Sequence, residues 1–275
     1  MRVGVDVGGT HTDDDLMDGD KVIAWHKTAT TEDVSSGITA AITEVLRQGK
    51  IDTASIESVM IGTTHFTNAF VERKHLLEVG IIRIALPAAR LLPPLIDWPA
   101  DMRERIGQHR HMVRGGYQFD GRENLPLDEM AVAEIARDLK SKGIRTFAVA
   151  GVFCQVNSAQ EERAAEIILE EVPDAKVTQS HNIGRIGLIE RENAAIMNAS
   201  LASLSTHVVT SFQEALKILG ITAPFYISQN DGTLMNAAIV EQYPVLTFAS
   251  GPTNSMRGAA YLSKHKDAIV ADIGG

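Results

Sequence analysis

Two short strings of the same design stand at opposite ends of the 275-residue sequence. Residues 3–9 read Val-Gly-Val-Asp-Val-Gly-Gly, and residues 269–275 read Ile-Val-Ala-Asp-Ile-Gly-Gly. Each is an apolar run, typical of a short strand, that ends in an aspartate, one more apolar residue and two glycines. An internal repeat carries more weight than a single motif, and this one indicates two related halves.

These strings contain the residue types of a magnesium–phosphate site. Glycines that follow a strand allow backbone N–H groups to approach phosphate oxygens. The carboxylates of Asp6 and Asp272 are suited to hold Mg²⁺, chiefly through water molecules. Two such elements facing each other across a cleft would clamp a nucleoside triphosphate and its metal ion. The predicted phosphate-binding backbone and hydroxyl groups belong to Gly8, Gly9, Thr10, Thr12, Gly274 and Gly275.

Other glycine motifs of nucleotide-binding proteins do not occur. The sequence has no Gly-x-x-x-x-Gly-Lys-Ser/Thr loop, and no Gly-x-Gly-x-x-Gly follows the first strand. A P-loop is therefore excluded and a Rossmann dinucleotide site is disfavoured. Each aspartate–glycine string could instead be an ordinary tight turn. The presence of a second copy disfavours that interpretation.

Two further polar groups stand where helices are expected to begin. Thr63, Thr64, His65 and Asn68 follow a predicted strand, where capping residues are common in any protein. Gly251 lies in Ser-Gly-Pro at the start of another helix, whose free N–H groups suit an anion. A simple turn and cap explains this second group equally well.

The remaining candidates have simpler explanations. His11 and the aspartates 13–15 fit a solvated acidic turn, and alternate residues of a strand point to opposite faces, which disfavours a metal cluster. His109 and His111 are expected to be a surface pair. Cys154 follows an apolar strand and is expected to be a small buried side chain.

Strand and helix patterns alternate along most of the chain and predict an α/β architecture with a largely parallel sheet. Helices are identified by apolar residues every three or four positions. One long helix, or two in series, is predicted over residues 189–219. The predicted strands cover residues 3–7, 22–25, 58–61, 80–86, 146–153, 176–179, 225–228, 245–249 and 268–273. The other predicted helices cover residues 34–45, 132–139 and 164–168 and a segment after Pro252.

Composition divides the chain into four consecutive parts. Residues 1–86 are predicted to form a first nucleotide-binding subdomain with the first phosphate loop. Residues 87–126 hold five of the nine prolines, and we expect a loop-rich, mobile excursion outside the sheet core. Residues 127–188 form an α/β subdomain, and residues 189–275 carry the long helix and the start of the second phosphate loop.

Charge and cysteine content limit the partners and the compartment. Lys and Arg number 26 against 35 Asp and Glu, a net charge of −9, which disfavours nucleic acid as a partner. A single cysteine fits a reducing cytosol. The start lacks a signal-peptide pattern and no apolar run is long enough to span a bilayer. We therefore expect a cytoplasmic protein that is not bound to membranes.

Several motifs follow one another in the order of a known family. They are residues 4–13 (Gly-Val-Asp-Val-Gly-Gly-Thr-His-Thr-Asp), 62–69 (Gly-Thr-Thr-His-Phe-Thr-Asn-Ala), 190–193 (Glu-Arg-Glu-Asn), 198–199, 250–252, 258–259 and 272–275. The sequence thus resembles the ATP-dependent hydantoinase/5-oxoprolinase family, which includes a subunit of acetone carboxylase. That family belongs to the larger fold group of actin, Hsp70 and sugar kinases.

The resemblance implies an actin-like, ribonuclease H-like fold of mixed sheets flanked by helices, cut before its second half is complete. It implies ATP and Mg²⁺ as cofactors and adds Asp13 and Gly251 to the nucleotide site. It also implies a hydrolase that opens a cyclic amide, such as a hydantoin or a 5-oxoproline-like lactam, after phosphorylating its carbonyl oxygen. The catalytic residues would be Asp6, Thr63, Thr64, His65 and Asn68.

Partners and completeness also follow from the resemblance. A second, hydantoinase B-like subunit and a homo-oligomer are expected. Because the second phosphate loop would stop at Gly275, we expect the chain by itself to be inactive as an ATPase.

Some positions depart from the family pattern. Asp14 and Asp15 replace small or apolar residues, Asn254-Ser255 replaces small residues, and Gln229–Gly232 replaces Ser-Asn-Gly-Gly. Two alternatives to the hydrolase stay open. One is a small-molecule kinase of the same fold group, and the other is an actin- or Hsp70-like nucleotide switch that binds a protein.

Overall fold

The computed structural model describes residues 1–31, 34–265 and 267–272 and divides the chain into two compact units. Unit 1 combines the two ends of the sequence, Met1–Glu72 and Leu204–Gly275, and unit 2 is Arg73–Ser203. This division is coarser than the four parts expected from composition, whose boundaries stay a prediction.

Unit 1 is built on a mixed sheet of six strands in the order β10-β9-β4-β1-β2-β3. Strand β1 pairs in antiparallel fashion with β2 and in parallel fashion with β4. The carboxyl ends of β1 and β4 therefore meet at one edge, beside the β1–β2 turn. The strands are β1 (Arg2–Val7), β2 (His11–Asp18), β3 (Lys21–Ala29), β4 (Ser58–Thr63), β9 (Phe225–Ser228) and β10 (Leu234–Asn236).

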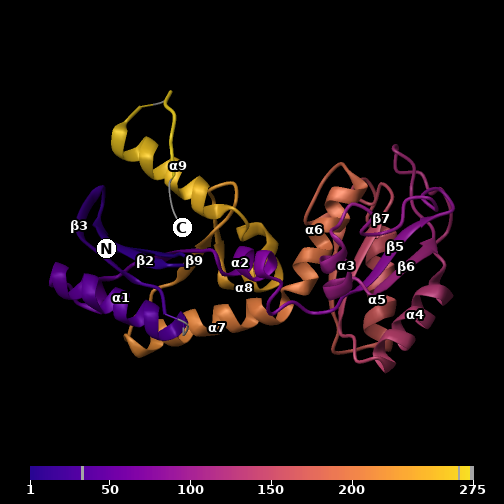
Figure 1. The fold of residues 1–275 in the computed structure, drawn as a ribbon, viewed down its shortest axis with the longest axis horizontal. Coiled ribbons are helices and arrows are strands. Elements are labelled where there is room, and N and C mark those ends of the chain that lie inside the picture. Colours follow the sequence, from indigo (N-terminus) through magenta and orange to yellow (C-terminus); the bar gives the residue numbers. More distant parts are fainter. Residues whose placement is uncertain (32–33, 266, 273–275) are drawn as a thin grey trace. The chain divides into compact units, whose positions relative to one another are not determined.

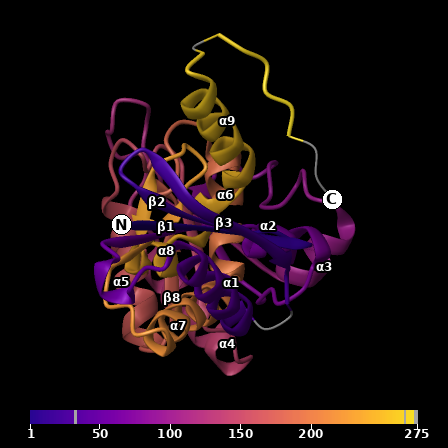
Figure 2. The ribbon, with the colours of Figure 1, turned by 90° about the vertical axis from the view of Figure 1, so that its left-hand side faces the viewer.

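The two faces of this sheet differ in character. Val3, Val5 and Val7 are buried, whereas Gly4 and Asp6 between them face the other way. Helix α1 (Val34–Gly49) packs on β2 and β3 at the valine face, and α7 (Ala202–Ile218) lies on the same side (Figures 1 and 2). Helix α9 (Ser250–Ser263) lies on the opposite side. The polar face of β1 therefore looks toward α9.

Unit 2 is a four-stranded parallel sheet in the order β6-β5-β7-β8. Helices α4 and α5 cover one face through a continuous apolar cluster that includes Ile82, Ile84 and Phe147. Helix α6 covers the other face (Figure 1). The elements are β5 (Gly80–Leu86), α3 (Ala100–Ile106), β6 (His109–Arg114), α4 (Glu129–Ser141), β7 (Thr146–Gly151), α5 (Ala159–Glu171), β8 (Lys176–Gln179) and α6 (Leu188–Ser200).

The structure corrects three expectations. Residues 87–126 are not wholly outside the sheet, since β6 pairs with β5; the prolines flank this strand and none interrupts it. The strand expected at 245–249 is wrong, because Pro244–Thr247 is a 3₁₀ turn, which a proline at its start favours. Residues 268–272 form no strand either, as no neighbour among the described residues pairs with them, and residue 273 lies outside the described part.

Other expectations are confirmed. The long helical stretch is two helices in series, α6 and α7, which meet at Leu201. Cys154 is fully buried, and burial raises the pKa of its thiol. Two further short helices complete unit 1, α2 (His65–Glu72) and α8 (Ala237–Gln242).

A buried ion pair ties α6 to the sheet of unit 2. The Arg83 guanidinium on β5 donates from Nε and Nη2 to both carboxylate oxygens of Glu192, with Nε at 2.7 Å. Both side chains are essentially inaccessible to solvent. The third guanidinium nitrogen donates to the carbonyl of Leu92, so that one buried cation also holds the loop after β5.

We expect Glu192→Ala to lower the free energy of unfolding by about 3–5 kcal/mol, because it leaves the Arg83 charge buried without a partner. Urea denaturation of the purified chain measures this loss. Glu190→Gln, at an exposed position of the same helix, should change stability by less than about 0.5 kcal/mol. Equal stabilities for the two variants would contradict the account.

A second buried charge lies on the valine face of unit 1. Both carboxylate oxygens of Asp14 are buried without a hydrogen bond among the described residues, and His26 Nδ1 lies 3.6 Å from Oδ1. Burial raises the pKa of Asp14 to about 6, and the nearby His26 opposes that rise. Asp14 is therefore not part of a solvated turn.

The raised pKa means that the folded chain holds the Asp14 proton more tightly than the unfolded chain, in which an aspartate titrates near about 3.9. Its stabilising contribution is complete below about pH 4 and is lost as the pH rises through about 6. We expect Asp14→Asn to raise the free energy of unfolding at neutral pH by on the order of 2 kcal/mol. It should also flatten the pH dependence of stability between these values.

Denaturant unfolding at a series of pH values measures this effect. Asp18→Asn, at the exposed end of the same strand, serves as the matched control and should keep the wild-type profile. An unchanged profile for Asp14→Asn would show that Asp14 ionises freely in the folded chain.

Candidate functional site

The turn between β1 and β2 is the glycine loop expected from the sequence. The N–H of Gly8 donates to the carbonyl of His11 at 3.0 Å, which closes the turn. A side chain at residue 8 would lie 2.9 Å from that same oxygen, so the turn requires glycine there. Gly9 and Thr10 are exposed at the tip. Their backbone is accessible to an anion.

The segment after β3 supports this loop from the side. The N–H of Thr30 donates to the Thr10 carbonyl at 3.0 Å, and its hydroxyl donates to the Gly8 carbonyl at 2.9 Å. Thr12 lies on the buried face of β2, with its hydroxyl 3.1 Å from that of Thr30. Thr12 and Thr30 therefore brace the loop from behind, and Thr12 does not join the polar face.

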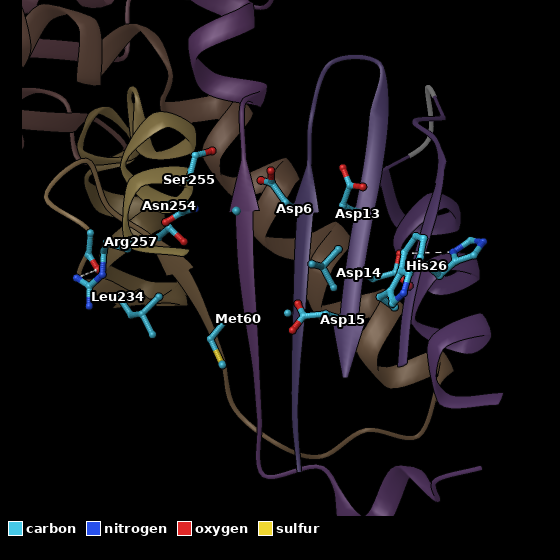
Figure 3. Close-up of a pocket in the computed structure, with 16 residues that line it drawn as sticks. Asp6, Asp13, Asp14, Asp15, His26, Met60, Leu234, Asn254, Ser255 and Arg257 are labelled. Carbon is cyan, nitrogen blue, oxygen red and sulfur yellow. Dashed lines mark hydrogen bonds and ion pairs between the residues drawn. The ribbon is translucent and has the colours of Figure 1, made fainter. Parts of the chain in front are cut away.

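Asp6 lies on the open, polar face of β1, directly opposite Asp13 of β2 (Figure 3). Desolvation by the surrounding protein raises its pKa, and the charges of Asp13 and Asp272 raise it further, while Lys27 opposes them. Asp272 from the end of the chain is thus near enough to act on Asp6. The two aspartates of the repeated strings come to the same site.

A missing side chain makes room for Asp6. A Cβ at Gly62 on β4 would lie 2.4 Å from Asp6 Oδ1 and 3.1 Å from Asn254 Nδ2. The Asp6 carboxylate and the Asn254 amide therefore both lie over the backbone of Gly62. In Figure 3, Asn254 and Ser255 approach Asp6 from α9.

The Gly-Thr-Thr-His segment joins β4 to α2 beside the loop. Thr63 is buried, and its hydroxyl lies 2.6 Å from His65 Nδ1 and accepts the His65 N–H at 3.2 Å. Thr64 donates its N–H to the Val7 carbonyl at 3.2 Å and accepts from Asn68 Nδ2 at 3.1 Å. Thr63 therefore caps the start of α2, and Thr64 anchors that start to the end of β1.

Asn68 and His65 lie in α2, and both have properties relevant to a nucleotide or substrate site. A Cβ at Gly9 would lie 3.3 Å from Asn68 Nδ2, so the Asn68 amide is next to the glycine loop. Burial lowers the pKa of His65, and the charge of His207 adds to that effect. Both influences favour the neutral imidazole, which can donate a hydrogen bond from one ring nitrogen and accept one at the other.

Helix α9 begins at Ser250 with Ala249 in the left-handed region at φ 59°, and the alanine at this N-cap position has no side-chain group that could cap the first turn. Gly251 has open space on its side-chain side. One turn later, the Ser255 hydroxyl donates to Asp272 Oδ2 at 2.8 Å. The second aspartate is therefore held by α9, and Gly274 and Gly275 lie outside the described residues.

A cavity of about 630 Å³ lies between the polar face of the sheet and α9. Its walls include Asp6, Asp13, Gly62, Asn254 and Arg257. The Arg257 guanidinium faces this cavity and donates to the Gly232 carbonyl. The cavity lies wholly within unit 1.

Sequence reasoning missed the site roles of four residues, Asn254, Ser255, Arg257 and Lys27. Asn254 and Ser255 were noted only as departures from a family pattern. Lys27 was not noticed, although its ammonium lies 2.8 Å from both carboxylate oxygens of Asp13. Only the register of the β2–β3 hairpin brings Lys27 to Asp13, and residue spacing carries no signal of it.

The donor set fits a magnesium ion better than a metal bound by protein alone. Among the described residues, no three His, Cys, Asp or Glu side chains converge on one point. Mg²⁺ usually takes one or two carboxylates and completes its shell with water and phosphate. Asp6 and Asp272 match that demand, and the charges of Asp13 and Asp272 add to desolvation in raising the pKa of Asp6, an effect that a cation would oppose.

Two further expectations from the sequence concern a pair of histidines and the absence of membrane-spanning segments. Half-buried His111 and its neighbour His109 lie on β6 in unit 2, and His109 Nε2 is 3.3 Å from a Glu78 carboxylate oxygen. Neither histidine is among the residues that line the cavity of unit 1. Over residues 1–31, 34–265 and 267–272, the helices lack the length and apolar character needed to cross a membrane.

Similar proteins are found by sequence and by structure. The chain is 26% identical to the acetophenone carboxylase gamma subunit of Aromatoleum aromaticum, over 99% of this chain and 41% of that protein. It is 24% identical to the caprolactamase subunit alpha of Pseudomonas jessenii, over 100% of this chain and 42% of that protein.

Two solved structures share the fold. They are the ATP-dependent caprolactamase of P. jessenii, with a TM-score of 0.78 and 22% identity, and the nucleotide-free acetone carboxylase, with a TM-score of 0.77 and 21% identity. Each match covers 96% of this chain and 40% of the other. This mixed α/β fold is consistent with the actin-like ATPase layers expected from the sequence.

The chain spans about two fifths of the length of these relatives, 41% and 42% of the two proteins named above. The model of the hydantoinase/oxoprolinase N-terminal region matches residues 2–172, and the hydantoinase/oxoprolinase model matches residues 191–275. The chain therefore belongs to the hydantoinase/oxoprolinase family.

Proposed function

We propose that this chain is the nucleotide-binding part of an ATP-dependent hydrolase that opens a cyclic amide. One observation carries the proposal: Asp6 lines a cavity of unit 1 on the strand that leads into the glycine loop, and Asp272 is near enough to raise its pKa, as a site for magnesium and phosphate requires. The solved structure of a relative described as an ATP-dependent caprolactamase supports the substrate class.

In this proposal each group has one task. Backbone N–H groups of Gly9 and Thr10 bind phosphate oxygens, and Asn68 adds an amide donor beside them. Asp6 and Asp272 hold Mg²⁺, which would neutralise phosphate charge when bound. The N–H groups of the first turn of α9, at Gly251, face the same negative charge. Catalysis by these groups consists of positioning and charge neutralisation.

Coupling to ATP suits an unstrained amide. Its carbon is a poor electrophile, and transfer of the terminal phosphoryl group of ATP to the carbonyl oxygen, with release of ADP, makes that carbon electrophilic. Water then adds to the carbon, the ring C–N bond breaks with the nitrogen leaving as the protonated amine, and a second water hydrolyses the resulting acyl phosphate to carboxylate and phosphate. Hydantoins and 5-oxoproline-like lactams belong to this substrate class. A neutral His65 beside Thr63 would act as a hydrogen-bonding group toward substrate.

A second candidate is ATP-dependent carboxylation of a ketone. Two relatives, acetophenone carboxylase and acetone carboxylase, are named for that activity. Both activities would use the same nucleotide site, and they differ in the acceptor that the activated group meets. The relatives are also named as alpha, beta and gamma subunits, so we propose that a second subunit contributes to the complete enzyme.

Phosphate release from ATP by the full-length protein that carries this chain distinguishes the candidates. We expect stimulation by a cyclic amide in a panel of ε-caprolactam, hydantoin and 5-oxoproline. Stimulation by acetone with bicarbonate would favour the carboxylase, and stimulation by a sugar would favour a kinase. ATP hydrolysis that none of these compounds changes would contradict the hydrolase and favour a nucleotide switch.

We expect Gly62→Ala to weaken Mg·ATP binding by roughly tenfold or more, because the new methyl group would lie 2.4 Å from Asp6 Oδ1 and displace the carboxylate. Isothermal titration calorimetry measures the affinity. Gly4→Ala is the matched control, since its methyl group would lie 2.2 Å from Asp15 Oδ1, a carboxylate to which we assign no role.

The two variants make the same chemical change on neighbouring strands of one sheet face. Thermal melts check that both remain folded. Equal losses of affinity would mean that general strain in the sheet, and not the position of Asp6, determines nucleotide binding.

A further inference from the structure

Three charged residues cross the polar face of unit 1 in one row. The strand register places Asp6 opposite Asp13, and Asp13 opposite Lys27. Residues paired across antiparallel strands share a face, so all three side chains point to the side of the sheet that carries the cavity. Val7 alone separates Asp6 from the glycine loop on β1, and His11 and Thr12 separate the loop from Asp13 on β2.

The Lys27 ammonium is held by one carboxylate and acts on another. It donates to both oxygens of Asp13 at 2.8 Å, with each side chain half exposed. It also lowers the pKa of Asp6, against the other influences on that group. Because Lys27 occupies both oxygens of Asp13, this carboxylate is better placed to orient a cation than to bind a metal.

The backbone fixes Lys27 relative to the phosphate loop. Three residues beyond Lys27, Thr30 donates its N–H to the Thr10 carbonyl and its hydroxyl to the Gly8 carbonyl. The end of β3 and the tip of the loop therefore form one hydrogen-bonded unit. A lysine side chain is long and flexible, so its ammonium can leave Asp13 for a phosphate at the loop without movement of the backbone.

The negative charge of the proposed nucleotide site requires a cation in addition to magnesium. Asp6 and Asp13 line the cavity and the charge of Asp272 acts on Asp6, so three carboxylates lie near one another, and a bound triphosphate brings further negative charge. One Mg²⁺ does not balance that sum. Arg257 lies on the wall of the cavity and is held by the Gly232 carbonyl. Lys27 is the cation that is fixed to the loop itself.

We propose that Lys27 receives the terminal phosphates of the bound nucleotide, and that Asp13 positions its ammonium until the nucleotide arrives. The proposal rests on the nucleotide site proposed above and assigns to this site a residue outside the Asp-x-Gly-Gly strings. Exchange of a carboxylate partner for a phosphate partner keeps the ammonium paired at every stage.

The test is calorimetric binding of Mg·ATP, Mg·ADP and adenosine to the full-length protein. We expect Lys27→Met to weaken Mg·ATP about 10- to 100-fold, the effect of losing a charge-assisted hydrogen bond. The loss should be smaller for Mg·ADP and absent for adenosine. Lys27→Arg should recover most of the affinity. Lys21→Met, at the opposite end of the same strand, is the matched control and should bind as wild type does.

A double variant separates phosphate contact from simple neutralisation of Asp13. In Lys27→Met the Asp13 carboxylate is left unpaired and repels phosphate, so adding Asp13→Asn should restore part of the affinity for Mg·ATP. Partial recovery supports direct contact between Lys27 and the nucleotide. Complete recovery would overturn it, since Lys27 would then only neutralise Asp13.

Asp6→Asn, measured in parallel, distinguishes failure of this inference from failure of the proposed function. If Asp6→Asn abolishes Mg·ATP binding while Lys27→Met binds normally, the nucleotide site stands and the role of Lys27 is refuted. If wild type does not bind Mg·ATP, or Asp6→Asn binds as wild type does, the proposed function and the role of Lys27 both fail.

Discussion

The carboxylate of Asp6 lies over a backbone that carries no side chain, and the rest of the site depends on this contact. Gly62 on the parallel neighbour β4 leaves the space, and the Asn254 amide of α9 fills what remains beside it. Three segments far apart in the sequence are thus fitted to one carboxylate. A methyl group at residue 62 would displace the Asp6 carboxylate from its place over the β4 backbone. The strands could make room for the methyl group only by moving apart, which would break the hydrogen bonds between them.

The fold explains why phosphate chemistry would be located here. Parallel pairing brings the ends of β1 and β4 to the same edge, so the glycine loop and the start of α2 are neighbours. Antiparallel pairing of β1, β2 and β3 then places Asp6, Asp13 and Lys27 in one row. Helix α9, whose N-cap residue is an alanine, lies over the same face, and Asp272 is held there by Ser255.

Sequence reasoning succeeded where a local pattern determines the outcome. The strand–aspartate–glycine string predicted β1 and its turn, and apolar spacing predicted α1, α4 and the helix pair α6–α7. It failed where contacts between residues far apart in the sequence determine the structure. Lys27 joins the site only through hairpin register, and Asp14 is buried only because β2 presents alternate residues to α1. Of the strand expected at residues 268–273, the described residues 268–272 pair with no described neighbour, and Pro244 begins a helical turn where a strand was expected.

The pKa of Asp6 in the presence and absence of Mg·ATP tests the central claim most directly. Titration of the Asp6 carboxyl carbon by NMR, assigned with Asp6→Asn, gives this value without reference to enzymatic activity. In the free protein the pKa should lie above that of an ordinary aspartate, because desolvation, Asp13 and Asp272 all raise it. If Asp6 holds the magnesium of a bound nucleotide, saturating Mg·ATP should lower the pKa well below its free value. A pKa that Mg·ATP leaves unchanged or raises would contradict the account.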